Sequence, residues 1–283
     1  DDLDNAPMVG SDHADLLTAN DIFLEAGTEG NTLLSETLSQ TPKQIFGLGG
    51  DDEIYGSSGS DKLYGGEGDD RIYSFGADDH NPGGAMAETI KGEAGNDLIY
   101  AGLSDTAWHN FDGGSGEDAM SFTYRMGGID LKATASTVFG TETTNLAQAS
   151  IYQDFETFVG SAHADTMDMS AHDSALSLYG KLGADVHTGG LRNDTIEGGS
   201  GDDVIAGGAG ADVLQGGWGS DTLDYSQSAA GVSVNLNRGT ATGGDATGDA
   251  ISGFENAIGS DARDVFVATH SSNTLELGDG ADK

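Results

Sequence analysis

A nine-residue pattern repeats five times without interruption between residues 180 and 224, and it constrains the fold more than any other feature of the chain. The units read GKLGADVHT, GGLRNDTIE, GGSGDDVIA, GGAGADVLQ and GGWGSDTLD. Glycine is always first, aspartate always sixth and valine or threonine always seventh, and the eighth residue is apolar except for His187 in the first unit. The pattern predicts a six-residue turn followed by a three-residue strand.

Stacking of such units is required, because no single unit can bury its own apolar residue. Side chains alternate along a strand, so the eighth residues of successive units form one apolar column. The sixth-position aspartates stack as well, and a row of bare carboxylates repels itself. Calcium removes this repulsion, because it accepts several hard oxygen ligands from carboxylates and backbone carbonyls. The pattern therefore predicts that Ca²⁺ binds along the stacked aspartates.

The same pattern occurs earlier, in six units that follow one another from Gly47. The fourth of these, SFGADDHNP, has lost its glycines and carries Asn81 at the core position, so we expect a bulge or loop there and no calcium at Asp79 or Glu88. A further unit, GGSGEDAMS, follows, and the final residues LGDGADK begin another one with Asp282. The aspartates expected to bind calcium are Asp52, Asp61, Asp70, Asp97, Asp118, Asp185, Asp194, Asp203, Asp212 and Asp221.

These units resemble the G-G-x-G-x-D-x-U-x nonapeptide of the RTX (hemolysin-type) calcium-binding repeat family. The resemblance implies an all-β parallel β-roll, a β-solenoid in which two nonapeptides make one turn and calcium lies between successive loops on each edge. It implies that Asp185, Asp203 and Asp221 lie along one edge, and Asp194 and Asp212 along the other. It also implies a secreted or cell-surface bacterial protein, exported by a type I apparatus that reads an uncleaved C-terminal signal.

Two segments between the repeat blocks resemble each other, YQDFETFVGSAHADTM and ISGFENAIGSDARDVF. They are similar to spacers in the C-terminal β-roll region of serralysin-like metalloproteases and other type I exported proteins. Their shared GSxxxD element contains Asp165 and Asp264, and MVGSDHADLL near the start places Asp15 in the same position. These aspartates supply either an extra calcium ligand or a plain turn. Alternation in residues 231–236 predicts a strand with one apolar face.

The order of repeats and spacers predicts a modular chain. Because it begins without methionine and stops inside a repeat, we expect it to be a piece of a larger protein. The expected segments are a partial spacer or cap (1–46), a first β-roll block (47–121, with irregular units at 74–91 and 101–112), a β spacer (122–179), a second block (180–224), a duplicate spacer (225–277) and the start of a further repeat (278–283).

Charge restricts the possible partners. The chain has 48 acidic and 11 basic residues and a formal net charge of −37. Its compact state would repel itself without counterions, so we expect folding to depend on calcium. This charge argues against nucleic acid and anionic membranes as partners. Cysteine is absent, so no disulfide replaces calcium, and no apolar run of about 20 residues predicts membrane insertion.

Catalytic motifs are missing from the sequence. It contains no HExxH zinc motif and no GxSxG elbow, so we expect no enzyme in this chain. One expected function is structural or adhesive, with other copies or cell-surface polysaccharide as partners. The alternative is the noncatalytic C-terminal secretion and stabilisation domain of an exported hydrolase, such as a metalloprotease, lipase or polysaccharide-modifying enzyme. Segments 74–87 and 105–112 are either partner-contacting loops or surface bulges.

Overall fold

The computed structural model describes the strands of a repetitive, all-β chain. Its described residues are 44–56, 61–74, 89–101, 109–140 and 150–283, with the backbone of two short strands, β1 (Met8–Val9) and β2 (Leu16–Thr18). Within them the only helical element is one 3-10 turn, η2 (Gly244–Ala246). Asp15, Asp79 and Glu88 lie outside the described residues, as do segments 75–88 and 102–108.

Two compact units make up the chain. The first contains Asp1–Met126 and Thr143–Phe155, and the second contains Gly127–Glu142 and Glu156–Lys283. The first spacer expected from the sequence is thus divided between the two units. The reason is that its strands pair with repeat strands of both blocks: β13 (Ile151–Gln153) pairs with β9 (Asn110–Ser115), and β14 (Thr157–Val159) pairs with β16 (Ser177–Leu182).

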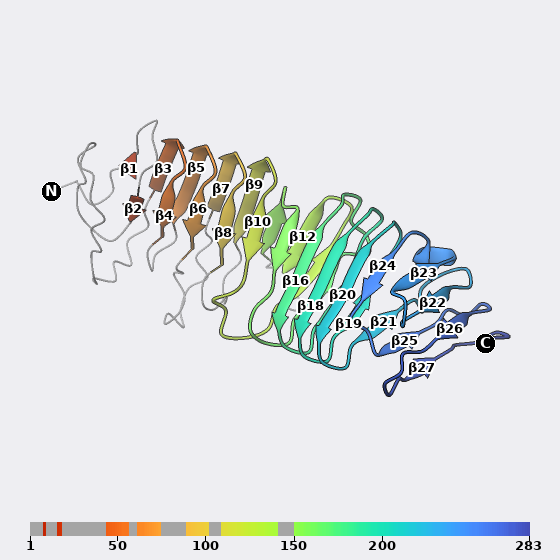
Figure 1. Cartoon of the computed structure of the whole chain (residues 1–283). Helices are drawn as coiled ribbons and strands as arrows, with labels where there is room; N and C mark the ends of the chain where they lie inside the picture. The colour runs from red at the N-terminus through yellow and green to blue at the C-terminus, as the bar shows by residue number, and fades with distance from the viewer. Residues whose placement is uncertain are drawn as a thin grey trace. The chain divides into compact units, whose positions relative to one another are not determined.

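In the first unit the chain alternates between two sheets, so that successive coils lie side by side (Figure 1). One sheet contains, in spatial order, β1, β3 (Gln44–Gly49), β5 (Lys62–Glu67), β7 (Thr89–Ala94), β9 and β13. The other contains β2, β4 (Glu53–Tyr55), β6 (Arg71–Tyr73), β8 (Leu98–Tyr100) and β10 (Ala119–Ser121).

The second unit has the same two-sheet plan, with an antiparallel hairpin inserted into each sheet. One sheet contains β12 (Thr137–Gly140), β11 (Asp130–Ala133), β15 (Thr166–Asp168), β17 (Val186–Thr188), β19 (Val204–Ala206), β21 (Thr222–Asp224), β25 (Asn256–Ile258) and β27 (Leu275–Glu276). The other contains β14, β16, β18 (Thr195–Ser200), β20 (Val213–Trp218), β24 (Ala250–Ser252), β23 (Thr240–Thr242), β22 (Ser233–Asn235) and β26 (Val265–Val267). The hairpins are β11–β12 and β22–β23.

Strand register follows the repeat length. Ile196 in β18 lies beside Leu214 in the parallel strand β20, an offset of two nonapeptides. One turn of the solenoid is therefore two units, and the predicted β-roll is confirmed. Between β5 and β7 the offset is larger, because Leu63 lies beside Ile90. Strands β5 and β7 are therefore offset by three nonapeptides instead of two.

Eighth-position side chains form the predicted column at the centre of the roll. A three-residue strand buries its central residue between the sheets and turns its neighbours outward, as the burial pattern of β19 shows for Ile205. Each of these side chains is 0% exposed, because the coils before and after it cover it from solvent. The buried eighth-position residues are Ile54, Leu63, Ile72, Ile90, Ile99, Met120, His187, Ile196, Ile205, Leu214 and Leu223.

His187 is the polar exception in this column. It lies between Met167 and Ile205 in neighbouring strands, is 0% exposed, and neither ring nitrogen has a hydrogen-bond partner. Burial lowers its pKa to about 4, so the imidazole is neutral in the folded chain at pH 7.

Replacing His187 with leucine is expected to stabilise the second unit. The substitution removes two unsatisfied buried polar atoms, each of which costs about 1–3 kcal/mol. Urea unfolding in the presence of calcium should show a higher midpoint for His187→Leu. His270→Leu, at an exposed histidine, is the matched control and should leave the midpoint unchanged. A lower midpoint for His187→Leu would show that the imidazole has a favourable contact in the column.

Ninth-position tyrosines in the first unit stack along the outside of one sheet. Tyr73 of β6 lies parallel to Tyr55 of β4 and Tyr100 of β8, with ring centroids 4.4 and 4.6 Å apart. Such contacts add about 0.5–1.5 kcal/mol beyond the buried area. They hold successive coils in register on the side opposite the apolar column.

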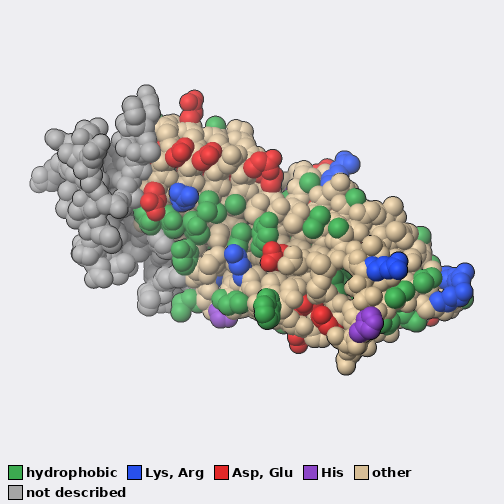
Figure 2. Space-filling model, in the orientation of Figure 1, with side chains coloured by type: hydrophobic (Ala, Val, Ile, Leu, Met, Phe, Trp, Pro, Cys, Tyr) green, Lys and Arg blue, Asp and Glu red, His purple; other side chains and the backbone are tan. Residues whose placement is uncertain are grey.

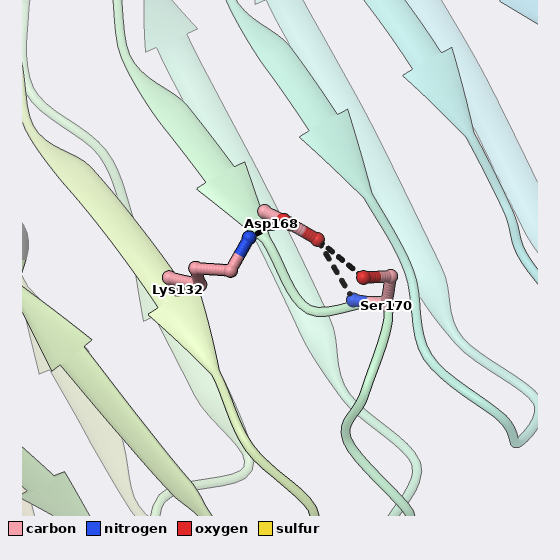
Figure 3. A network of polar contacts seen from close by, with 3 residues as sticks. All are labelled: Lys132, Asp168 and Ser170. Atoms are coloured by element: carbon pink, nitrogen blue, oxygen red, sulfur yellow. Dashed lines mark hydrogen bonds and ion pairs between the residues drawn. The ribbon is translucent and has the colours of Figure 1, made fainter.

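The spacer hairpins extend the roll. In β22 Val234 is 1% exposed and Ser233 is exposed, which confirms the predicted strand with one apolar face. The two spacers also fold alike, because β11 pairs in parallel with β15 as β22 pairs with β26. Figure 3 shows polar contacts on the outer face of the β11–β15 pair, where the Lys132 Nζ forms an ion pair with the Asp168 Oδ2 at 2.7 Å. Ser170 donates two hydrogen bonds to Asp168 Oδ1, one from its Oγ and one from its backbone amide.

Surface charge matches the composition. Acidic side chains gather over the strands of the first unit on the face shown in Figure 2. Within the described residues no helix has the length and apolar character needed to cross a membrane.

Candidate calcium-binding edges

The first six residues of each repeat form the loop that carries the chain from one sheet to the other. In the second unit, loops 180–185, 198–203 and 216–221 leave the β16 sheet and enter the β17 sheet; we call this side the first edge. Loops 189–194 and 207–212 return on the second edge. The predicted two-edge arrangement is therefore present, with Asp185, Asp203 and Asp221 on one side and Asp194 and Asp212 on the other.

A row of hydrogen bonds connects the aspartates of each edge. The backbone amide of Asp185 donates to Asp203 Oδ1 at 2.8 Å, and the amide of Asp203 donates to Asp221 Oδ1 at 2.9 Å. On the second edge the amide of Asp194 donates to Asp212 Oδ1 at 2.8 Å. Each carboxylate is thus fixed by the coil before it, at a spacing of one turn. We call each such series a carboxylate row.

The first unit contains a carboxylate row of the same kind. The amide of Asp52 donates to Asp70 Oδ1, that of Asp70 to Asp97 Oδ1, and that of Asp97 to Asp118 Oδ1, at 2.8–2.9 Å. All four side chains are at most 2% exposed. Asp61 is equally buried and lies on the opposite edge, at the loop that enters β5.

The second carboxylate oxygen distinguishes these loops from ordinary turns. In most aspartates of the carboxylate rows, each of which forms one rung of its row, Oδ1 accepts the amide hydrogen bond, whereas Oδ2 is buried and has no hydrogen-bond partner in the protein. An unsatisfied buried oxygen is costly unless another group contacts it. The aspartates with such an Oδ2 include Asp70, Asp97, Asp185, Asp203, Asp212 and Asp221.

Backbone carbonyls point into the same space. A Cβ added to Gly180 would lie 2.3 Å from Asp185 Oδ2 and 2.3 Å from the carbonyl oxygen of Gly198 in the next coil. The first glycine of each repeat therefore leaves room beside a carboxylate oxygen and a carbonyl oxygen from two successive coils. A Cβ on Gly198 would meet Asp203 Oδ2 at 2.4 Å and the Gly216 carbonyl at 2.7 Å.

This donor set fits calcium. Among the described residues no three His, Cys, Asp or Glu side chains form a group able to hold a metal, so a cation here takes backbone carbonyls along with carboxylates. Calcium accepts such mixed oxygen ligands in flexible geometry, whereas zinc prefers nitrogen and sulfur. The residues that would hold it are the sixth-position aspartates, with the first-position carbonyl of the next coil.

Carboxylate pKa values reflect the crowding. Burial, followed by the charges of neighbouring carboxylates, raises the pKa of Asp97, Asp185 and Asp212 from 3.8 to about 7. The same causes raise the pKa of Asp70 and Asp221 to about 6. Without a cation, ionising these groups in the folded chain is therefore unfavourable.

We predict that acid stabilises the calcium-free roll. The folded-state pKa values lie above the unfolded value, so the folded chain binds these protons more tightly. Stability gained in this way is fully present below about pH 4 and is lost as the pH rises through about 7. Circular dichroism of chelator-treated protein should show more β-structure at pH 5 than at pH 8.

A salt titration at pH 8 is the control for that experiment. Salt screens repulsion between exposed charges but leaves buried carboxylates ionised, so it should restore less β-structure than acid does. An acid titration that leaves the signal unchanged would contradict the raised pKa values. With calcium present the direction is opposite, because protons compete with the cation for the same oxygens.

Some residues of the carboxylate rows have no repeat motif around them. The amide of Asp212 donates to Asp249 Oδ1 at 2.9 Å, and the amide of Asp221 donates to Glu255 Oε2 at 3.0 Å. Tyr225 donates its hydroxyl to Asp249 Oδ2 at 2.7 Å. Sequence reasoning missed Asp249 and Glu255, and only their positions just before β24 and β25 could have indicated them.

The GSxxxD aspartates belong to the carboxylate rows as well. Asp165 lies on the first edge, where its amide donates to Asp185 Oδ1 at 2.8 Å. Asp264 has the same position relative to Asp282, with a distance of 2.9 Å. The sequence left open whether these aspartates were ligands or turn residues, and their spacing to the repeats was the available signal.

The stacked coils and carboxylate edges define a calcium-binding β-roll. The model of one protein family, described as the RTX calcium-binding nonapeptide repeat (4 copies), matches the chain at residues 45–79, 82–105 and 188–223. The chain therefore carries RTX calcium-binding nonapeptide repeats, and calcium is their cofactor. A comparison with curated proteins found no match.

Proposed function

We propose that this chain is the calcium-folded β-roll of a secreted bacterial protein and that it has a structural or adhesive role at the cell surface. The observation that carries the proposal is the buried row of aspartates in each unit, in a chain of net charge −37; Oδ2 has no hydrogen-bond partner in the protein at Asp70 and Asp97 of the first unit or at Asp185, Asp203, Asp212 and Asp221 of the second. Such a chain is poorly suited to fold where calcium is scarce. It is well suited to fold where calcium is abundant, as outside cells.

The protein's own residues prepare the sites. Amide-to-Oδ1 hydrogen bonds fix each carboxylate, and the apolar column sets the distance between coils. Bound calcium supplies the positive charge that neutralises the edges. Because calcium binds only the folded form, each site adds about 1.4 kcal/mol of stability for every tenfold excess over its dissociation constant. Several sites acting together would make folding a steep function of calcium concentration.

A second candidate is supported by the spacers. Their resemblance to serralysin-like spacers favours the noncatalytic C-terminal secretion and stabilisation domain of an exported hydrolase. In that case the roll stabilises an enzyme whose catalytic residues lie elsewhere in the parent protein. The gene that encodes the chain separates the two candidates, since an HExxH or GxSxG motif upstream would favour the hydrolase.

Cell fractionation tests the location and the role together. An antibody against the chain should detect it on the surface of the producing bacterium, and a chelator wash should release it or expose it to protease. Other copies and cell-surface polysaccharide are the partners to examine in the released material. Detection only in the cytoplasm, with no response to chelator, would overturn the proposal.

A further inference from the structure

Repeat loops of the second unit have two different backbone conformations. Loop 198–203 has positive φ at its second and fourth positions, +109° at Gly199 and +142° at Gly201. Loop 207–212 shows the same pair at Gly208 and Gly210. Loops 160–165, 189–194 and 259–264 have no residue with positive φ at either position. We call the first kind open loops and the second kind closed loops.

The fourth residue accounts for the difference. Open loops have glycine there, which adopts positive φ without strain. Closed loops have His163, Arg192 and Ala262 at this position, and residues with a Cβ adopt such angles only at a cost. The choice of conformation is therefore encoded in each repeat.

In two of the three closed loops, both oxygens of the loop's carboxylate are satisfied. Asp165 Oδ2 accepts the Ser161 amide at 2.7 Å, and its Oδ1 accepts the Ser161 hydroxyl at 2.8 Å. Asp194 Oδ2 accepts the Gly190 amide at 2.6 Å. In open loops the corresponding Oδ2, as in Asp203, has no partner in the protein. The donors of the closed loop contact the oxygen that calcium would otherwise contact.

Each closed loop supplies the first carboxylate of its row. The residue before it in the row is not acidic: Ile129 donates its amide to Asp165 Oδ1 at 2.9 Å, and Leu176 donates its amide to Asp194 Oδ1 at 2.8 Å. Open loops follow on both edges, at Asp185 and Asp212. The coil before each of these closed loops therefore contributes no carboxylate to the row.

The third closed loop supports this placement in part. Val232 donates its amide to Asp264 Oδ1 at 2.7 Å, and the Ser260 hydroxyl donates to the same oxygen at 2.9 Å. Asp264 Oδ2, however, has no partner, so this rung is only half satisfied. In the first unit the sequence places GSDHAD between β1 and β2, which pair with β3 and β4 just before the row of Asp52.

We propose that loops 160–165 and 189–194 are calcium-independent end rungs. In them Ser161 and the second-position amides replace calcium at the carboxylate, so each row of calcium sites begins one coil later. The inference rests on calcium binding by the repeats and does not depend on the surface role proposed above. It removes Asp194 from the predicted ligands and assigns Asp165 a metal-free structural role.

Counting bound calcium tests the proposal directly. Asp165→Asn, Asp194→Asn, Asp203→Asn and Asp212→Asn are compared with the unchanged chain by equilibrium dialysis and elemental analysis, with folding checked by circular dichroism. We expect fewer bound calcium ions only for Asp203→Asn and Asp212→Asn. An equal loss in folded Asp165→Asn or Asp194→Asn would overturn the proposal. If the unchanged chain bound no calcium, calcium binding itself would be wrong, which is a distinguishable outcome.

A gain-of-site variant decides the matter even if the asparagine variants fail to fold. Arg192→Gly converts GGLRND into GGLGND, which has the glycine of an open loop. The substitution removes an exposed hydrogen bond from the Arg192 Nε to the Asp173 carbonyl oxygen, and we expect this loss to change the stability of the fold little. We expect this variant to bind additional calcium. An unchanged count would show that the fourth residue does not control the site.

Discussion

Replacing Gly201 with valine is expected to abolish calcium-induced folding of the second unit. The φ of Gly201 is +142°, and a Cβ there would lie 1.3 Å from the carbonyl oxygen of Gly183 in the preceding coil. The backbone angle alone costs about 1–3 kcal/mol for a residue with a side chain. The clash adds to this cost, because its partner is backbone and cannot rotate away.

A calcium titration followed by circular dichroism measures the effect of Gly201→Val. The matched control is Gly127→Val, since Gly127 is exposed, has no positive φ, and a Cβ there would meet nothing within 4 Å. We expect the control to fold at the same calcium concentration as the unchanged chain. If Gly201→Val did so too, the coils could not be stacked as closely as the structure shows.

Replacing Ile205 with alanine is expected to cost about 2–5 kcal/mol of unfolding free energy. Ile205 is 0% exposed and lies between His187 and Leu223 in the apolar column. Its neighbours belong to separate coils of parallel strands, so they cannot collapse into the cavity without changing strand register. The loss should therefore lie toward the upper part of that range.

Urea unfolding at saturating calcium measures this cost. Val213→Ala provides the control, because Val213 is 51% exposed at the start of β20 and its side chain lies outside the column. Surface substitutions of this kind usually change stability by less than about 0.5 kcal/mol. Equal urea midpoints for Ile205→Ala and Val213→Ala would contradict the proposed contribution of the apolar column to stability.

Periodicity was enough to predict stacked turn–strand units with an apolar column and rows of aspartates, whereas the parallel β-roll was predicted from the resemblance to RTX repeats. The eighth-position residues and the sixth-position aspartates recur every nine residues, and each kind is buried at the same place in successive coils. Ile205 and Asp203 could therefore be placed from the sequence. The resemblance to RTX repeats added the two-edge arrangement, which the hydrogen bonds confirm.

The remaining details depend on three-dimensional context. Asp249 belongs to the same carboxylate row as Asp212 but lies 37 residues after it in the sequence. The spacing is larger than two nonapeptides because the β22–β23 hairpin lies between β21 and Asp249 along the chain. Asp194 has the same motif position as Asp212, yet its Oδ2 is satisfied by Gly190. That difference accompanies Arg192, which stands where the open loops have glycine, but its effect on Oδ2 becomes visible only in the three-dimensional structure of the loop.

Circular dichroism with and without a calcium chelator at pH 7.5 tests the central claim most directly. Carboxylate rows with unpartnered oxygens and a net charge of −37 predict that the β-signal is lost when calcium is removed and returns when calcium is restored. A β-signal that is the same before and after calcium removal would contradict calcium-dependent folding of this roll.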